Sequence, residues 1–252
     1  MADQAGRWQG RNPAKDALRA EIWRTLEREE AAIGNPWSSI PDFVGAREAA
    51  TRLTELPFWK PARIVKTNPD RAQGWIRLLA LEAGKTVYTP VPELTADFPF
   101  LRLDPDQLSQ QSVAFEDVMY SDGALRHGER VQFEAMEGMD ICVVGSVAVG
   151  GNGGRTGKGA GFADLEMGIF RELDLLPNST PVVTTVSDWQ VVEDSQVPLE
   201  AHDTPLDWVV TPTRVLETNT TVARPKQLDW SAVRQDQFDA IPFLRALQKR
   251  LN

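Results

Sequence analysis

The spacing of apolar residues along the chain predicts helices and strands in alternation. Near the start, residues 13–30 carry Leu18, Ile22 and Leu26 four positions apart, which is the spacing of one helix face. A proline opens this segment, where its fixed φ suits the first helical turn, and an acidic run closes it. A second, shorter helix is predicted over residues 46–56.

Downstream, short apolar runs alternate with further helical segments. The run of residues 140–149 is apolar almost throughout, as expected of an interior strand that is covered on both faces. Strands that alternate with helices form a mainly parallel sheet with helices on both sides, so the pattern predicts the α/β class. We expect one domain over residues 13–252, preceded by a loose polar arm over residues 1–12. The predicted strands occupy residues 62–66, 86–91, 140–149, 181–192 and 206–216, and the further predicted helices residues 71–83, 162–173 and 238–251.

The composition is that of an ordinary globular protein. Of the 252 residues, 42% are hydrophobic and 25% are charged, which suffices for a sizeable core. The net charge of −9 argues against a nucleic-acid partner, which would require a basic face. Apolar runs stay well below the roughly 20 residues that cross a membrane, and the first residues lack a signal-peptide pattern. Because the chain has one cysteine, Cys142, we expect no internal disulfide and a cytoplasmic location.

The scarcity of histidine and cysteine restricts the metal chemistry that we expect. The chain has two histidines, His127 and His202, besides Cys142. A zinc site of imidazole or thiolate ligands is therefore not expected, and a bound metal would be a hard cation held by carboxylates and phosphate oxygens. His202 could serve as a general base, but the sequence offers no serine or cysteine partner for it, which favours a surface histidine.

Glycines concentrate in residues 145–161 and predict a phosphate-binding turn. This segment follows an apolar run and precedes an amphipathic helix, whose first N–H groups and dipole favour an anion at that place. Glycines let the backbone approach a ligand closely, and Arg155 and Lys158 add full positive charges. A plain surface loop is the alternative interpretation. Eight of the chain's 18 glycines lie in this segment, at positions 145, 150, 151, 153, 154, 157, 159 and 161.

Two common nucleotide-binding motifs do not match this segment. The P-loop requires a glycine where this chain has Asn152, and a serine or threonine after Lys158, where it has Gly159. The dinucleotide fingerprint requires a βαβ unit with an acidic residue about 20 positions further on, and the segment fits that arrangement poorly.

Residues 157–164 (GKGAGFAD) resemble the signature G-[KR]-G-x-G-Y-Y-D of the 5-formyltetrahydrofolate cyclo-ligases, which are also called methenyltetrahydrofolate synthetases. Residues 15–19 (KDALR) match the K-x-x-L-R of that family, and residues 202–207 (HDTPLD) fall where the family has D-x-x-x-D. The resemblance extends from residue 15 to about residue 216. It implies a three-layer α/β/α sandwich with a mainly parallel sheet, of the NagB/RpiA/CoA-transferase-like type, with the site at the carboxyl ends of the parallel strands.

The resemblance also implies an activity and its cofactors. Enzymes of this family use ATP and magnesium to convert 5-formyltetrahydrofolate to 5,10-methenyltetrahydrofolate, with release of ADP and phosphate. Carried over to this chain, Lys158 and Arg155 would act catalytically on the transferred phosphoryl group. Asp164 and Asp203 would hold magnesium, and Asp70 would face the substrate. The residues that would bind ATP are Lys15, Arg19, Gly157, Lys158, Gly159, Gly161, Phe162 and Asp164.

Several of these residues also have a simpler structural interpretation. Asp164 falls in the first turn of a predicted helix, where the dipole favours any carboxylate. Asp203 could form a local turn and Asp70 could cap the helix that follows it. Lys15 and Arg19 lie four positions apart and could form a solvated stripe.

The chain departs from the family signature at the paired tyrosines, which are Phe162 and Ala163 here, and Asp70 is one methylene shorter than the family's glutamate. Residues 145–149 and 211–215 look more like a paralogous branch, the methenyltetrahydrofolate-synthetase-domain-containing type. Two alternatives therefore stay open: an enzyme of this fold that acts on a thiamine-related or sugar-phosphate substrate, and a non-catalytic nucleotide-binding module. In each case the partner is a small molecule, and both a monomer and a homodimer stay open.

Overall fold

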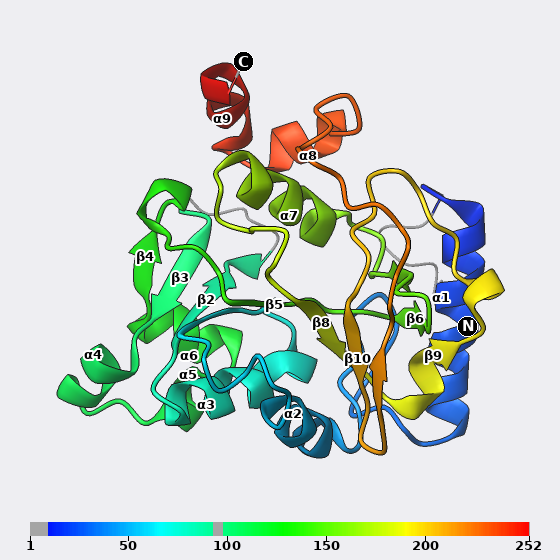
Figure 1. Cartoon of the computed structure of the whole chain (residues 1–252), viewed down its shortest axis with the longest axis horizontal. Coiled ribbons are helices and arrows are strands. Elements are labelled where there is room, and N and C mark those ends of the chain that lie inside the picture. Colours follow the sequence, from blue (N-terminus) through cyan, green and yellow to red (C-terminus); the bar gives the residue numbers. More distant parts are fainter. Residues whose placement is uncertain (1–9, 93–97, 252) are drawn as a thin grey trace.

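The predicted parallel sheet runs through the middle of the molecule. Its strands are β1 (Ile64–Lys66), β2 (Thr86–Pro90), β3 (Phe100–Leu103), β4 (Glu129–Val131), β5 (Ile141–Val143), β8 (Val182–Thr185), β10 (Trp208–Val210) and β11 (Val215–Glu217). In the computed structural model, which describes residues 10–92 and 98–251, these strands follow the order β11-β10-β8-β5-β1-β2-β3-β4 (Figure 1). Neighbours from β10 to β2 are parallel, and β11, β3 and β4 extend the two edges antiparallel. The predicted α/β class with a mainly parallel sheet is confirmed.

Helices cover both faces of this sheet. The α-helices of the described residues are α1 (Pro13–Arg28), α2 (Ala46–Thr54), α3 (Gly74–Glu82), α4 (Pro105–Gln110), α5 (Phe115–Val118), α6 (Ser121–His127), α7 (Phe162–Glu172), α8 (Gln235–Ala240) and α9 (Leu244–Leu251). α7 lies over one face with α8 and α9 beyond it, and α2 and α3 lie under the other face (Figure 1). The three-layer sandwich is therefore confirmed.

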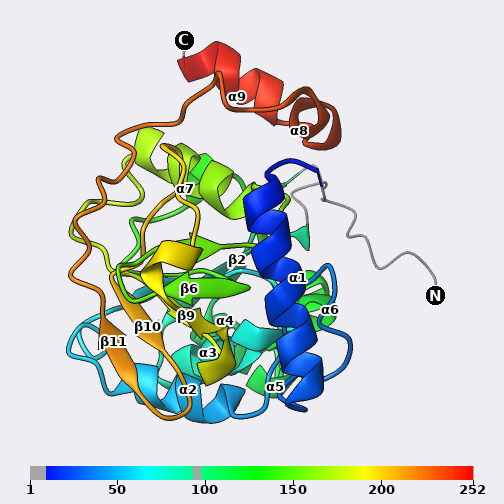
Figure 2. The ribbon, with the colours of Figure 1, turned by 90° about the vertical axis from the view of Figure 1, so that its right-hand side faces the viewer.

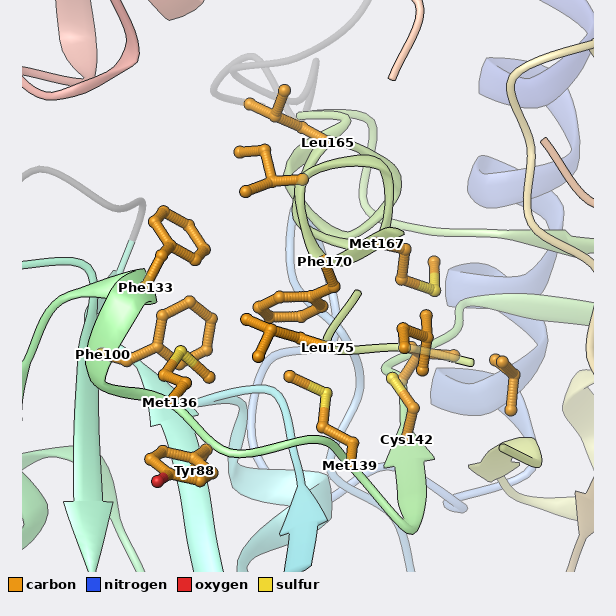
Figure 3. Packing of buried hydrophobic residues seen from close by; sticks show 14 of the residues in the cluster. Tyr88, Phe100, Phe133, Met136, Met139, Cys142, Leu165, Met167, Phe170 and Leu175 are labelled. Carbon is orange, nitrogen blue, oxygen red and sulfur yellow. The ribbon is translucent and has the colours of Figure 1, made fainter. Parts of the chain in front are cut away.

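Helix α7 is held on the sheet by a cluster of buried aromatic rings. The ring centroids of Phe100 and Phe133 are each within 6 Å of that of Phe170, at 5.3 and 5.9 Å. Figure 3 shows the Phe170 side chain of α7 among these rings, with Met139 and Cys142 nearby. Rings packed in this way bury large apolar areas and add an edge-to-face attraction. They fix the position of α7, and with it the position of the loop that leads into its first turn.

Helix α1 packs against a second, smaller sheet formed by β6 (Ala148–Gly150), β7 (Arg155–Thr156) and β9 (Val191–Val192) (Figure 2). The helix starts where the Asn12 side chain accepts a hydrogen bond from the backbone N–H of Lys15, at 3.0 Å. The predicted apolar stripe of this helix is buried against the protein. Lys15 and Arg19 are also buried, so the interpretation of these two residues as a solvated stripe is wrong.

The apolar run of residues 140–149 is divided between the two sheets, so the prediction of one interior strand is wrong. β5 lies between β1 and β8 in the large sheet, and the N–H of Val144 still bonds to the carbonyl of Val183 at 2.9 Å. Beyond it, the N–H of Val147 bonds to Thr156 of the small sheet at 2.7 Å. Both halves are buried, and hydrophobicity alone cannot tell which sheet buries each half.

The predicted helix over residues 238–251 is also divided. α8 ends at Ala240 and α9 begins at Leu244. Pro242 lies between them, where its ring and its missing N–H interrupt a continuous helix.

Candidate functional site

A cleft of about 350 Å³ opens at the carboxyl ends of β1, β2 and β5, which is the edge of the sheet where the sequence analysis expects the site. Its size is that of a small-molecule site. The fold brings together residues as far apart in sequence as Lys15 and Asp203, 188 positions from one another. All the predicted site residues lie in its lining: Lys15, Arg19, Asp70, Arg155, Gly157, Lys158, Gly159, Gly161, Phe162, Asp164 and Asp203.

The glycine-rich segment consists of a hairpin and a loop, and is not the single turn that the sequence predicts. β6 and β7 pair on either side of residues 151–154, and residues 157–161 then lead into α7 at the cleft. Gly153 belongs to the hairpin, where a β-carbon would lie 2.5 Å from the Leu206 carbonyl oxygen. In the loop, Gly159 and Gly161 have φ of 106° and 75°, a region that glycine adopts without strain.

The loop presents the N-terminal end of α7 to the cleft. Gly161 is the N-cap of the helix, and no side chain caps it among the residues that the structure describes. The loop carbonyls are occupied: Arg11 donates to Gly159 O at 3.0 Å, and Arg234 donates to Ala160 O at 2.8 Å. A helix start without a side-chain cap, with its positive dipole end at a cleft, favours an anionic ligand.

Arg155 lies on the small sheet and is almost fully buried. One of its terminal nitrogens forms an ion pair with Asp164 Oδ2 at 2.7 Å, and the other donates to Gly145 O at 3.2 Å. Its Nε has no hydrogen-bond partner within the described residues. Burial alone would lower the pKa of Arg155, but Asp164 raises it above the usual value. Arg155 is therefore a fixed, fully charged cation at the base of the cleft.

The two cations of α1 also have partners within the protein. Lys15 Nζ lies 2.6 Å from Asp203 Oδ2 and 2.8 Å from Glu200 Oε2. The hydrogen bond from Lys15 lowers the pKa of the Glu200 carboxyl. Arg19 donates to Gly157 O at 2.7 Å and pairs with Asp16 at 2.6 Å. Arg19 thus fixes the start of the glycine loop.

Lys158 and Asp70 face each other across the cleft, with Nζ 3.6 Å from Oδ1. Asp70 occupies the N-cap position of the helical turn that follows it, but among the described residues its side chain forms no capping hydrogen bond to that turn. This ion pair is the longest of those that the predicted cations form. Lys158 is therefore the predicted cation that a ligand can engage with the least loss of existing contacts.

Arg77 of α3 holds the loop that carries Asp70. Its Nε donates to Met119 O at 2.7 Å, and its two terminal nitrogens donate to Asn68 O and, at 3.1 Å, to Asp70 O. Burial lowers the pKa of this guanidinium to about 10. Arg77 has no distinguishing signal in the sequence, because an arginine in an amphipathic helix resembles a solvated residue until its burial is known.

A second buried ion pair lies beneath the cleft and is also absent from the sequence prediction. Glu166 of α7 lines the cleft, and its Oε2 lies 2.7 Å from Nζ of Lys66, the last residue of β1. Burial raises the pKa of the Glu166 carboxyl, and Lys66 opposes the rise. The sequence signal for this pair is a charged residue next to apolar ones. Glu166 lies between Leu165 and Met167, and Lys66 ends an apolar strand.

Residues from both ends of the described chain complete the cleft lining. Arg11 and Asn12 line it, although the sequence analysis assigns them to a loose arm. Residues 1–9 of that predicted arm lie outside the described residues. Arg234 reaches the cleft from the C-terminal segment, and no sequence motif marks it, because its contribution depends on how the chain returns over the glycine loop.

The donors in the cleft suit a hard cation. Glu200, His202 and Asp203 form a group of possible metal ligands, each offering an atom within 4.8 Å of the others, and it is the one such group in the described part of the chain. Asp164 lies outside this group and is paired with Arg155. Carboxylate oxygens are ligands that magnesium prefers. The residues present therefore fit magnesium better than zinc, because the group offers one imidazole and no thiolate.

The fold and this cleft define an α/β protein with a cation-lined cleft at the carboxyl ends of its parallel strands. Residues 11–212 match the model of the protein family described as the 5-formyltetrahydrofolate cyclo-ligase family. This match covers most of the chain and includes all the predicted site residues. The chain belongs to the 5-formyltetrahydrofolate cyclo-ligase family.

Sequence similarity to known proteins supports this assignment. The chain is 36% identical over 239 residues to the mouse methenyltetrahydrofolate synthase domain-containing protein and 32% identical over 239 residues to the human protein of that name. These matches cover 94% of this chain but 64% and 62% of the two relatives, so the chain spans less than two thirds of their length. The resemblance to this diverged branch is confirmed.

A solved structure supports the fold. The 5,10-methenyltetrahydrofolate synthetase of Aquifex aeolicus superposes with a TM-score of 0.51 at 19% sequence identity, over 87% of this chain and 99% of that one. At 19% sequence identity, this similarity shows a shared fold alone. The described residues include no helix with the length and apolar character that a membrane span requires.

Proposed function

We propose that the chain is an ATP- and magnesium-dependent enzyme that converts 5-formyltetrahydrofolate to 5,10-methenyltetrahydrofolate, with release of ADP and phosphate. The observation that carries this proposal is the gathering of cations around the N-terminal end of α7, in a chain of the cyclo-ligase family. Such a cluster suits a polyphosphate, because several full charges and a helix start act on it together. The cations are Lys15, Arg19, Arg155 and Lys158.

Nucleotide and magnesium would bind together by an exchange of ionic partners. Lys15 is paired with Asp203, and Arg155 is paired with Asp164. When phosphate oxygens approach the two cations, the two carboxylates lose part of their compensation and become better ligands for a cation. A metal held by one or two carboxylates and by phosphate oxygens is the usual arrangement for magnesium. Bound ATP should therefore raise the affinity for magnesium, and by linkage bound magnesium should raise the affinity for ATP by the same factor.

In the proposed reaction, the formyl oxygen of the substrate attacks the γ-phosphorus of ATP, and the bond from that phosphorus to ADP breaks. The N10 amine then attacks the formyl carbon and loses its proton, and phosphate leaves with the former formyl oxygen. Lys158 and Arg155 would offset charge on the transferred phosphoryl group, and Asp70 would face the folate. Bound magnesium would supply further charge neutralisation on the phosphates.

A second candidate is an enzyme that keeps the phosphate site and acts on another substrate, thiamine-related or sugar-phosphate. The observation that favours it is the change in the signature, where Phe162 and Ala163 line the cleft without the phenols of the family. A nucleotide-binding module without catalysis would share the same cation cluster.

One experiment separates the cyclo-ligase reaction from the other two candidates. The protein is incubated with ATP, magnesium and 5-formyltetrahydrofolate, and the absorbance of the methenyl product is followed together with ADP release. Product and ADP in equal amounts support the cyclo-ligase reaction. ATP binding, measured by titration of the same protein, without methenyl product favours the second candidate or the module. A protein that does not bind ATP contradicts the cyclo-ligase reaction and the nucleotide-binding module.

A further inference from the structure

The ion pair of Glu166 and Lys66 lies at the floor of the cleft and has no counterpart in the signature residues. Glu166 is 2% exposed and Lys66 is fully buried. Lys66 Nζ lies 2.7 Å from Glu166 Oε2 and also donates to Asn68 Oδ1 at 2.9 Å. Apart from this ion contact, no donor is bonded to Oε2 among the described residues. The carboxylate therefore keeps capacity to accept a hydrogen bond.

Fold stability does not explain this pair well. Removing two charges from water is costly, and a buried ion pair is often no more stabilising than apolar side chains of the same volume. The Phe170 ring, whose centroid lies 5.8 Å from Lys66 Nζ, offsets part of this cost on the lysine by a cation–π contact, and the described residues offer the Glu166 carboxylate no comparable contact besides Lys66. Desolvated charges at the floor of a cleft are instead common at functional sites.

The cleft has two chemically different halves. The phosphate half is formed by Lys15, Arg19, Arg155 and the loop of residues 157–161. The other half, which we name the acceptor half, lies at the ends of β1 and β2 and is lined by Ile40, Asn68, Asp70, Pro90, Val91 and Glu166.

The acceptor half combines carboxylates with an apolar wall. Asp70, Lys158 and Glu166 line the same cleft, and Lys158 Nζ lies 3.6 Å from Asp70 Oδ1. The two lysines of this region are already engaged, Lys66 with Glu166 and Lys158 with Asp70. These two pairs leave the acceptor half without net charge, and its carboxylate oxygens favour a group that donates hydrogen bonds.

We propose that Glu166, held by Lys66, is a specificity-determining residue that accepts a hydrogen bond from the exocyclic amino group of a flat nitrogen heterocycle. The apolar wall suits the ring faces, and the carboxylates suit its N–H edge. The inference rests on the proposed function, because the phosphate half would hold the nucleotide while the acceptor half holds the ring. Aminopteridines and aminopyrimidines share this chemistry, and they represent the folate and thiamine-related candidates.

The test compares ring pairs that differ at the amino group. Pterin is compared with lumazine, which has an oxygen in place of the 2-amino group, and 4-amino-2-methylpyrimidine with its 4-oxo analogue. Binding to the full chain is measured by calorimetry in the presence of magnesium and a non-hydrolysable ATP analogue. We expect the amino compound of one pair to bind about 10- to 150-fold more tightly than its oxo analogue, the range for a hydrogen bond to a charged group. Whichever pair shows this preference identifies the substrate class.

Variants assign this preference to Glu166. In Glu166→Gln, which keeps the size and removes the charge, the preference should fall to about threefold or less, while the affinity for the ATP analogue stays within about twofold. Lys158→Ala is the matched control and should weaken the nucleotide but keep the ring preference. Because Glu166→Gln leaves Lys66 without a counter-charge, the double variant Lys66→Met with Glu166→Met serves as a second test, and it should also lose the preference.

The outcomes for this inference and for the proposed function are distinct. If Glu166→Gln folds and keeps the full preference, or if the unaltered protein prefers neither amino compound, the inference is wrong even where ATP binds. If the unaltered protein prefers an amino compound but does not bind ATP, the inference stands and the proposed function falls. If neither Glu166→Gln nor the double variant folds, the unaltered protein decides: a preference for an amino compound supports the inference, and no preference rejects it.

Discussion

Replacing Lys158 with alanine tests the phosphate site at its most loosely held cation. The side chain is 28% exposed and Nζ lies 3.6 Å from Asp70 Oδ1. The Coulomb attraction at this distance is about 1–5 kcal/mol for an effective dielectric constant of 80 down to 20, and such pairs retain about 0–1 kcal/mol net. A charge-assisted phosphate contact is worth about 1.5–3 kcal/mol. After subtraction of the existing pair, the variant should lose about 0.5–3 kcal/mol of ATP binding, or about 2- to 160-fold in Kd.

Isothermal titration of ATP into the parent and the variant measures this loss. Asp70→Asn is the matched control, because it removes the competing carboxylate and should leave the Kd for ATP unchanged or lower it. Thermal melts of the ligand-free proteins should differ by less than about 4 °C, since the pair contributes little to folding. If Lys158→Ala binds ATP as tightly as the parent, the glycine loop is a surface loop and the proposed phosphate site is wrong.

Three further predictions concern the loop, the α1 ion pair and the core. Gly159→Ala should weaken ATP binding in calorimetry, because a φ of 106° strains alanine by about 1–2 kcal/mol; an unchanged Kd would contradict this. Asp203→Asn removes one of two carboxylates from Lys15 and should lower the free energy of unfolding by about 3 kcal/mol in urea. An unaltered midpoint would show that this pair does not stabilise the fold. Burial raises the pKa of the Cys142 thiol, so Ellman's reagent should react with it only after denaturation. Rapid reaction of the native protein would refute that packing.

The sequence by itself determined the features that depend on local spacing. The four-residue spacing of Leu18, Ile22 and Leu26 predicts α1, because side chains four positions apart share one helix face. The glycines and cations of residues 155–161 predict the loop at the start of α7, because positive φ and a helix start are local properties. Each of these signals lies within about one helical turn or one strand. The signature match then joins distant segments into one expected site.

The tertiary structure decided which partner each of these residues contacts. It placed the first part of the apolar run 140–149 in the large sheet and the last part in the small one, a choice that hydrophobicity cannot make. It paired Lys15 with Asp203, 188 positions away, and Lys66 with Glu166 beneath the cleft. Such ion pairs depend on where the chain returns to the sheet, and burial sets their energy. A charged residue has the same letter in the sequence whether it lies in water or on the floor of a cleft, so its role becomes visible only when the fold has removed it from solvent.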